Sequence, residues 1–296
     1  MSLAPTLSVV IPTRDRPGQL GECLAAVARL DYPRSRLEIV VVDDGGSSAL
    51  EPVVDRYCDT HDISLVRQRH AGPAAARNAG AVHADGFLLA FIDDDVLVDP
   101  DWATAIARKA LTHPGAVIGG RTINSLPENP YASASEEIIA LAYRHYNSDP
   151  RAPRFFAARN LALPAPDFAA IGGFDPGFRT SEDREFCDRW RESGRELVYA
   201  PTAVARHANP LTLKSFWRQH VSYGRGAFAY HRVRSRRGQG LTGFEGSFYG
   251  LVARDAAESL RRRDLRHVGL LGLWQLANVA GFSAAALGGL LPSRDP

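Results

Sequence analysis

The sequence predicts an α/β fold, with a mostly parallel central sheet flanked by helices and a helical C-terminal extension. Three observations carry this prediction. Short apolar runs rich in β-branched residues alternate with segments whose apolar residues recur at helical spacing. Two of these runs end in consecutive aspartates, at Asp43 and Asp93, and beyond residue 211 the pattern is helical. We expect one domain over residues 1–210, with halves meeting near residue 120, and an extension over 211–296.

The first half reads as repeated strand and helix units. The helical segments centre on Leu20–Val27, Val53–Tyr57 and the small-residue stretch that begins at Gly72. Strands are expected at Leu7–Pro12, Leu37–Val42, Ile63–Val66 and Gly86–Ile92. Parallel strands joined in this way place their carboxyl ends on one rim of the sheet, which is where ligands bind.

The second half is less regular. Helices are expected from Trp102 to Leu111 and from Glu182 to Glu192, the latter capped by Ser181. The segment 124–153 is expected to form a flexible flap around one helix, over residues 136–146. The remaining strands are expected at Ala116–Gly120, Ala157–Leu163 and Leu197–Tyr199.

Composition limits the class of protein. The 296 residues, 45% of them hydrophobic, can form a substantial core. A formal net charge of +2 gives no strong field for nucleic acid or membrane, and we expect no nucleic-acid partner. The three cysteines show no metal-site or disulfide spacing, and no basic leader precedes an apolar run. A cytoplasmic protein is expected.

Asp93, Asp94 and Asp95 follow a buried run without a break. Three adjacent carboxylates repel each other unless a cation or hydrogen-bond donors lie among them. At the carboxyl end of a strand they are well placed to hold Mg²⁺ or Mn²⁺ together with the phosphates of a nucleotide. The alternative is a solvated acidic turn.

Other polar residues are expected on the same rim. Asp44 could accept hydrogen bonds from a nucleotide, or belong to an Asx-turn. The loop Thr13–Arg16 offers guanidinium groups for oxyanions, or is an exposed turn. Arg77 lies in a helix that a ligand can approach closely, although small residues also serve simple packing.

Two candidate groups come from the second half. Glu182 and Asp183 begin a predicted helix, whose N-terminus would lower a carboxyl pKa, so a base acting near neutral pH needs a partly desolvated setting. The alternative is helix-terminus electrostatics alone. His207 follows the last predicted strand and could be a further metal ligand, or a surface histidine.

These segments together resemble the inverting, nucleotide-sugar glycosyltransferases of the GT-A fold, glycosyltransferase family 2. The resemblance covers about residues 7–226 and rests on motifs that occur in the family's order. The motifs are Val9–Thr13, Val42–Gly45, Gly72–Gly80, Asp93–Asp95 (Asp-x-Asp type), Gly172–Asp175, Ser181–Asp183 (Thr-Glu-Asp type) and His207. The fold implied is a GT-A fold with a mostly parallel Rossmann-like sheet.

The resemblance implies residue roles. Asp183, beside Glu182, would be the catalytic base, and Asp95 with His207 would hold Mn²⁺ or Mg²⁺. The nucleotide-sugar would be bound by Pro12, Thr13, Arg14, Asp15, Asp44, Arg77, Asp93 and Asp94. The acceptor would be bound by Gly172, Gly173 and Phe174.

The implied reaction moves a sugar from a nucleoside-diphosphate donor to a hydroxyl of a glycan, lipid-linked or small-molecule acceptor. A processive synthase is not expected, because Gln219–Gly226 matches the family's Gln-x-x-Arg-Trp motif only loosely. A sugar-nucleotide nucleotidyltransferase is an alternative, but no lysine-containing, glycine-rich signature lies near the N-terminus. A nucleotide-binding module that has lost catalysis is a second alternative.

The tail contains the apolar stretch Val268–Leu291, preceded by Arg261–Arg263 and Arg266. Its length would span a bilayer, although Gln275 and Asn278 interrupt it. Three interpretations stay open: packing on the protein or in a homodimer, peripheral contact with the inner face of the cell membrane, and a true span.

Overall fold

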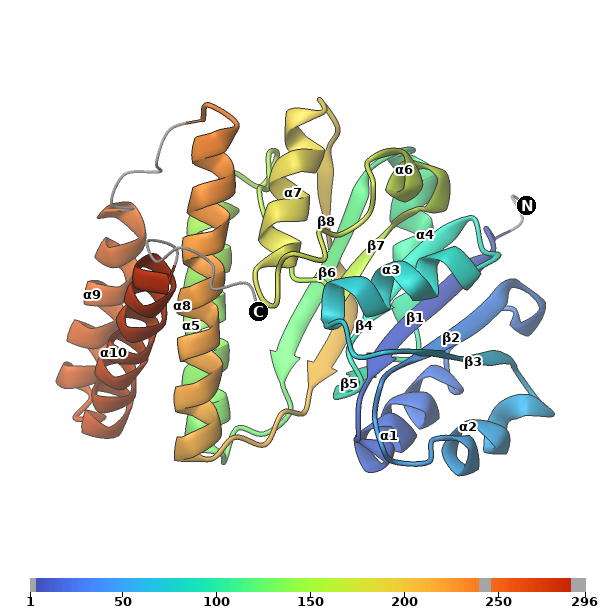
Figure 1. The fold of residues 1–296 in the computed structure, drawn as a ribbon, viewed down its shortest axis with the longest axis horizontal. Coiled ribbons are helices and arrows are strands. Elements are labelled where there is room, and N and C mark those ends of the chain that lie inside the picture. The colour runs from blue at the N-terminus through green and yellow to red at the C-terminus, as the bar shows by residue number, and fades with distance from the viewer. Residues whose placement is uncertain (1–3, 240–245, 289–296) are drawn as a thin grey trace, which may run out of the picture. The chain divides into compact units, whose positions relative to one another are not determined.

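The computed structural model describes residues 4–239 and 246–288. Eight strands form one sheet in the order β3-β2-β1-β4-β7-β6-β8-β5 (Figure 1). The strands are β1 (Leu7–Thr13), β2 (Leu37–Asp44), β3 (Asp62–Gln68), β4 (Leu88–Ile92), β5 (Val96–Val98), β6 (Val117–Asn124), β7 (Asn160–Pro164) and β8 (Leu197–His207). The α-helices are α1 (Pro17–Val27), α2 (Glu51–Cys58), α3 (Pro73–His83), α4 (Trp102–Thr112), α5 (Pro130–Tyr146), α6 (Ala165–Ala170), α7 (Glu182–Glu192), α8 (Leu213–Arg236), α9 (Gly246–Arg261) and α10 (Leu265–Gly288), and a 3-10 turn covers Arg34–Arg36.

The predicted α/β architecture is confirmed, and the sheet is mixed. The β3-β2-β1-β4 portion is parallel throughout, as the strand and helix units of the first half predict. Beyond β4 the direction changes, because β7 pairs antiparallel with both β4 and β6. The β6–β8 pair is parallel again, and β5 pairs antiparallel with β8 at the edge.

The chain forms two compact units. Of the described residues, the first unit contains those up to Ser125, Asp149–Gly177 and Glu182–Ala208. The second contains Leu126–Ser148, Phe178–Ser181 and the residues from Asn209 onward. The first unit therefore holds the sheet, and the second holds α5, α8, α9 and α10. The predicted division at residue 210 stays a prediction.

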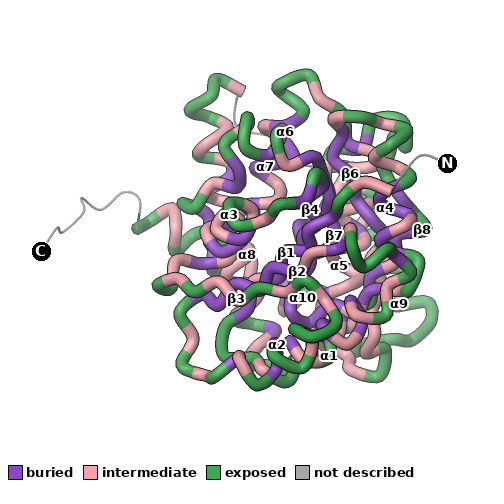
Figure 2. The backbone as a smooth tube through the Cα atoms, turned by 90° about the vertical axis from the view of Figure 1, so that its right-hand side faces the viewer, coloured by how far each residue is buried: buried purple, intermediate pink, exposed green. Residues whose placement is uncertain are grey.

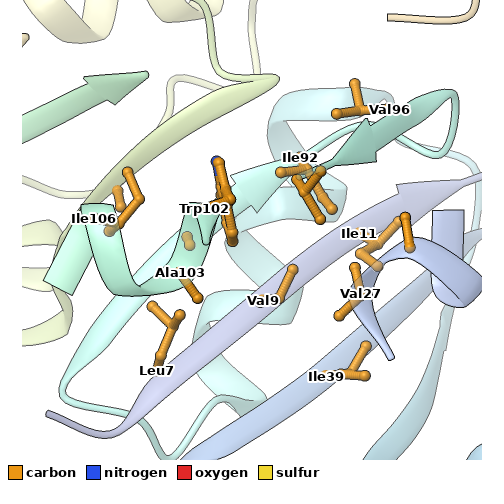
Figure 3. Packing of buried hydrophobic residues seen from close by; sticks show 14 of the residues in the cluster. Leu7, Val9, Ile11, Val27, Ile39, Ile92, Val96, Trp102, Ala103 and Ile106 are labelled. Carbon is orange, nitrogen blue, oxygen red and sulfur yellow. The ribbon is translucent and has the colours of Figure 1, made fainter. Parts of the chain in front are cut away.

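The core of the first unit lies on the sheet. Successive residues of a strand point to opposite faces, so Val9 packs toward α1 and α4 while Phe91 lies on the other side with Phe168 and Phe174. Strands β1, β2, β4 and β7 form the buried centre of this unit, whereas no residue of β3 is buried (Figure 2). Figure 3 shows Trp102 among the apolar side chains that strands and helices contribute.

The structure corrects four local predictions. The strand β5 directly follows the three aspartates and was not expected, because three residues are too few to show a period. Strand β8 extends to His207, which is its last residue rather than a residue beyond it. Helix α5 starts at Pro130 under an Asn129 cap, so most of the predicted flap is helical. Ser181 has a φ of 68°, unlike the extended backbone typical of an N-cap.

The second unit packs its helices around a smaller core. Phe216 of α8, Ile138 of α5 and Leu270, Leu271 and Trp274 of α10 are buried together. The predicted apolar stretch of residues 268–291 coincides with α10 as far as residue 288, and its end lies outside the described residues. Within the described chain, α10 is long and apolar enough to cross a membrane, a test that buried helices of soluble proteins also pass.

Candidate functional site

The carboxylates after β4 differ in their partners within the first unit, although Arg16 lies near both Asp94 and Asp95. Asp93 accepts from Nη2 of Arg77 at 2.6 Å. Asp94 accepts from the Thr13 hydroxyl at 2.7 Å and from Arg16 at 3.1 Å. Burial raises the pKa of Asp94 to about 6, against the lowering effect of Arg16 and Thr13. The tight turn before β5 thus brings β1 and α3 groups onto one acidic cluster, as expected for a shared rim.

Asp95 has a different environment. It is buried, and its Oδ1 has no hydrogen-bond donor in the described structure, although Nε2 of His207 lies 3.3 Å away and Arg16 lies 3.5 Å from Oδ2. Burial alone would raise the pKa of Asp95, but His207 and Arg16 outweigh it and the pKa is lowered. A buried carboxylate oxygen that accepts no hydrogen bond is suited to an oxygen-seeking cation.

His207 fits the ligand role less well. Nη1 of Arg159 lies 3.2 Å from Nδ1 of His207. Because arginine has no acceptor, Nδ1 must accept this bond, and a neutral imidazole then carries its proton on Nε2, facing Asp95. For Nε2 to bind a metal, that proton must leave and the contact with Arg159 must change. His207 as a metal ligand stays a prediction.

A cation at this site would need ligands from the substrate. In the described portions of the chain, no three His, Cys, Asp or Glu side chains are grouped closely enough to hold an ion by themselves. This is compatible with Mg²⁺ or Mn²⁺, which commonly bind one or two protein carboxylates and complete their shell with substrate phosphates and water. The residues present therefore fit a metal that arrives with a diphosphate, and Asp95 as its protein ligand stays a prediction.

Arg77 connects two parts of the site. It is buried in α3 and donates from Nη2 to Asp93 at 2.6 Å and from Nη1 to Glu182 at 2.7 Å. Its guanidinium also lies over the Phe174 ring, 5.7 Å from the centroid. Burial alone would lower the pKa of Arg77, but the two carboxylates outweigh it and raise that pKa. Arg77 therefore ties the start of α7 to the end of β4.

Asp183, the second residue of α7, is a buried carboxylate with a strongly shifted pKa. Burial and then the charge of Glu182 raise its pKa to about 7, against the opposing charge of Arg77. Its oxygens accept weakly from the Ala158 backbone at 3.3 Å and from the Arg184 backbone at 2.8 Å. Desolvation thus outweighs the helix N-terminus, and a group with this pKa can exchange protons near neutral pH.

The glycine-led turn is fixed by Asn78. Its side-chain amide accepts from the Phe174 N–H at 2.9 Å and donates to the Phe174 carbonyl at 2.7 Å. Gly173 has a φ of 66°, and a Cβ there would lie 2.7 Å from Oδ1 of Asn78, so only glycine fits without a shift. The Phe174 side chain is fully buried, so it packs beneath the turn rather than facing solvent. Acceptor binding by Gly172, Gly173 and Phe174 stays a prediction.

Two predicted nucleotide contacts are occupied by the chain itself. The Asp44 carboxylate accepts four hydrogen bonds, from Gln68, His70 and the backbone of Ala71 and Gly72. Asp15 accepts from the backbone of Ser47 and Ser48, which lowers its pKa to about 2. Both carboxylates fix loops on the rim, and their direct contact with a nucleotide stays a prediction.

The remaining residues predicted to bind the nucleotide-sugar differ in their solvent exposure. Pro12 is half-buried and Thr13 is buried at the end of β1, whereas the Arg14 side chain is exposed. Sequence reasoning missed Arg159 and the bridging role of Asn78. Arg16, for which an exposed turn was the alternative, is exposed and also pairs with Asp94. The Arg77–Asn78 pair in a small-residue helix was the available signal for Asn78. No local pattern pointed to Arg159.

Comparison with known proteins gives a consistent result. The family model described as glycosyl transferase family 2 matches residues 8–183. Validoxylamine A glucosyltransferase of Streptomyces hygroscopicus subsp. jinggangensis is 33% identical over 205 residues, covering 60% of this chain and 49% of that protein. The chain therefore matches about half the length of this relative.

Solved structures share the fold. A mannosyltransferase from Pyrobaculum calidifontis, solved with GDP-Man and Mn²⁺, aligns with a TM-score of 0.66 and 20% identity, over 98% of this chain and 78% of that one. The TarS fragment 1–349 of S. aureus, in complex with UDP-GlcNAc, gives a TM-score of 0.55 and 16% identity, over 95% and 83% of the two chains. At these identities the likeness concerns the GT-A fold.

Proposed function

The chain belongs to glycosyl transferase family 2, and from this premise we propose that it transfers one sugar from a nucleoside diphosphate to an acceptor hydroxyl with inversion at the anomeric carbon. The observation that carries the proposal is the Arg77 bridge. It joins Asp93, at the rim where ligands bind, to Glu182, the neighbour of Asp183. A proton acceptor with a pKa of about 7 thus shares one site with the acidic cluster.

Asp183 is the proposed base. Its carboxylate takes the proton of the acceptor hydroxyl as the hydroxyl oxygen attacks the anomeric carbon on the face opposite the diphosphate. The bond from that carbon to the diphosphate breaks, and its electron pair leaves with the phosphate oxygen. Positioned general bases of this kind contribute about 10² to 10⁴ in rate. The raised pKa of Asp183 supports this role because a stronger base accepts the proton more readily.

The donor is proposed to lie on the rim formed by the ends of β1 and β4. Arg16, whose side chain is half exposed, reaches the acidic cluster and can stabilise a diphosphate. Mn²⁺ or Mg²⁺ bound through Asp95 would neutralise the negative charge that the leaving diphosphate gains. The bound GDP-Man and UDP-GlcNAc of the structural neighbours support a nucleotide-sugar at this fold position.

Other features support proposals for the acceptor site and for the location of the protein in the cell. The turn at Gly172 and Gly173 borders the Arg77 network through Asn78, which supports acceptor binding there. Exposed apolar side chains on α10 support a lipid-linked acceptor and peripheral contact at the cytoplasmic face of the membrane. A homodimer through the same helix stays a further prediction.

A donor screen tests the proposed function. Purified protein with Mn²⁺ is given UDP-, GDP- and dTDP-sugars in turn, and the released nucleoside diphosphate is measured with and without simple acceptor sugars. We expect release with the sugars of one nucleotide, and loss of it in Asp183→Asn. Asp55→Asn, an exposed change in α2 whose side chain makes no hydrogen bond or ion pair in the described structure, is the matched control. Donor binding without release by any acceptor would favour a module that has lost catalysis.

A further inference from the structure

The second unit carries a row of basic side chains on α8. Lys214, Arg218, Arg225, Arg232 and Arg236 are all exposed. At about 100° per residue these positions lie within about 40° of one another on the helix surface, and they extend over about 33 Å. In the described parts of the chain none of the five forms an ion pair, and α8 contains no acidic residue. We name these five residues the α8 basic row.

The small net charge of the whole chain conceals this feature. Residues 209–296 contain 13 arginines and lysines against five aspartates and glutamates, a formal charge of +8, whereas residues 1–208 contain 22 against 28, a charge of −6. The overall value of +2 is the sum of two opposed regions. The rest of the second unit, residues 126–148 and 178–181, adds two basic and three acidic residues, so the unit as a whole has a formal charge of +7 and presents a positive field to an anionic partner.

The row is continued by a second basic group. A Cβ on Gly224 would lie 2.0 Å from the Asn278 carbonyl oxygen, and a Cβ on Gly281 would lie 1.9 Å from that of Val221. Helices α8 and α10 are thus in close contact, and they run in the same direction, because Phe216 near the start of α8 packs with Leu270 and Trp274 near the start of α10. Further along, Phe228 of α8 packs with Phe282 of α10. The exposed Arg261, Arg263 and Arg266 precede or begin α10, so they extend the positive charge beside the Lys214 end of α8. Nearby acidic groups are engaged, Asp255 with His267 and Glu258 with Arg262.

Helix α10 adds an exposed apolar surface to this unit. Leu265, Leu276, Val279 and Leu287 are between 51% and 68% exposed. Neither acidic nor basic residues occur between 268 and 288. Cations alone suit any polyanion, whereas cations combined with uncharged, exposed leucine and valine suit the headgroup and acyl boundary of a bilayer.

We propose that the α8 basic row is the surface through which this protein binds an anionic lipid bilayer, with α10 supplying apolar contact. The proposal deepens the membrane contact suggested above. It does not depend on the transfer chemistry, because vesicle binding needs neither donor nor acceptor. Basic side chains near an anionic surface each strengthen binding about fivefold at low ionic strength, so three contribute about a hundredfold.

Vesicle sedimentation tests the proposal with the full chain. Vesicles of phosphatidylcholine alone are compared with vesicles that contain phosphatidylglycerol, at low salt and at high salt. The row variant carries Arg218→Gln, Arg225→Gln and Arg232→Gln. Its matched control carries Arg29→Gln, Arg56→Gln and Arg108→Gln, three exposed arginines of the first unit with no ion pair in the described structure. Circular dichroism and melting temperature establish that both variants are folded.

We expect binding to anionic vesicles, weakened by salt, which the row variant weakens about a hundredfold and the control variant does not. Equal binding to neutral vesicles, or equal loss in both variants, would overturn the role of the row. A soluble single-stranded RNA is the competing polyanion. Tight RNA binding without vesicle binding would assign the row to nucleic acid and overturn the proposal. The double variant Leu276→Ser and Val279→Ser should weaken binding to vesicles but not binding to RNA. An unchanged vesicle affinity in this variant would show that α10 does not contact the bilayer.

Discussion

Replacing Asp183 with asparagine should make the protein inactive and more stable at once. The pKa of this carboxyl is about 7 in the folded chain against an ordinary value of 3.8. The folded state therefore holds a proton that the unfolded state releases, so stability falls as pH rises between about 4 and 7. Asparagine resembles the protonated form and removes this penalty.

The pKa difference gives the magnitude. At about 1.4 kcal/mol per pKa unit, the raised pKa of Asp183 lowers the free energy of unfolding by at most about 4 kcal/mol at pH 8 and about 2 kcal/mol at pH 5. For a chain of this size the melting temperature of Asp183→Asn should exceed that of the wild type by on the order of 10 °C at pH 8, and by about half as much at pH 5.

The pH dependence of turnover should report the ionisation of the same carboxyl group, that of Asp183. With a sugar donor in hand, kcat/KM of the wild type should rise with pH and level off above about 7, because only the ionised carboxylate accepts a proton. Asp183→Asn should lose about 10² to 10⁴ in rate together with this dependence. The measurements are melting scans and initial rates between pH 5 and pH 9, with Asp55→Asn as the control.

Two results would refute this reasoning. Melting temperatures that fall in Asp183→Asn at pH 8 would show that the ionised carboxylate stabilises the fold. Turnover that survives in the variant would remove Asp183 from proton transfer. Either result would direct attention to Glu182, which is the other carboxylate at the start of α7.

Three further variants test the surroundings of the base. Arg77→Met leaves Asp93 and Glu182 without their buried cation, so it should lower the free energy of unfolding, measured by chemical denaturation, by about 3–5 kcal/mol. It should also move the acid limb of the pH–rate profile to higher pH, since the charge of Arg77 lowers the pKa of Asp183. Asn78→Ala unpairs the Phe174 backbone, so it should cost about 1–3 kcal/mol and raise the KM of the acceptor more than that of the donor. Trp102→Ala, at a fully buried site, should cost about 3–5 kcal/mol with an unchanged KM for both substrates.

The parallel half of the sheet could be predicted because its strands are dense apolar runs. Val9, Val41 and Phe91 lie in segments rich in β-branched or aromatic residues, and each segment is followed by a helical pattern. The second half could not be predicted as well. Strand β5 has three residues and exists because it pairs with the end of β8, a partner more than 100 residues away. Local pattern contains no information on such a pairing.

Sequence-based prediction of the candidate site meets the same limit. The residue types at Asp95 and Asp183 were readable, but their environments were not, because burial and neighbours come from distant segments. Sequence could not show that Asp44 is saturated with hydrogen bonds from its own chain, or that the Phe174 ring is buried. The link from Arg77 to Glu182, 105 residues apart, is likewise a product of the fold.

The most direct test of the central claim is a melting-temperature screen with UDP, GDP and dTDP, each with Mn²⁺ and with EDTA. One nucleotide should raise the melting temperature when Mn²⁺ is present, by about 5–10 °C at 100 times its Kd, because it binds only the folded state. The shift should vanish with EDTA and in Asp95→Ala, the variant that lacks the proposed metal ligand. A folded protein that none of the three nucleotides stabilises, with or without Mn²⁺, would contradict a metal-dependent nucleotide-sugar site on this sheet.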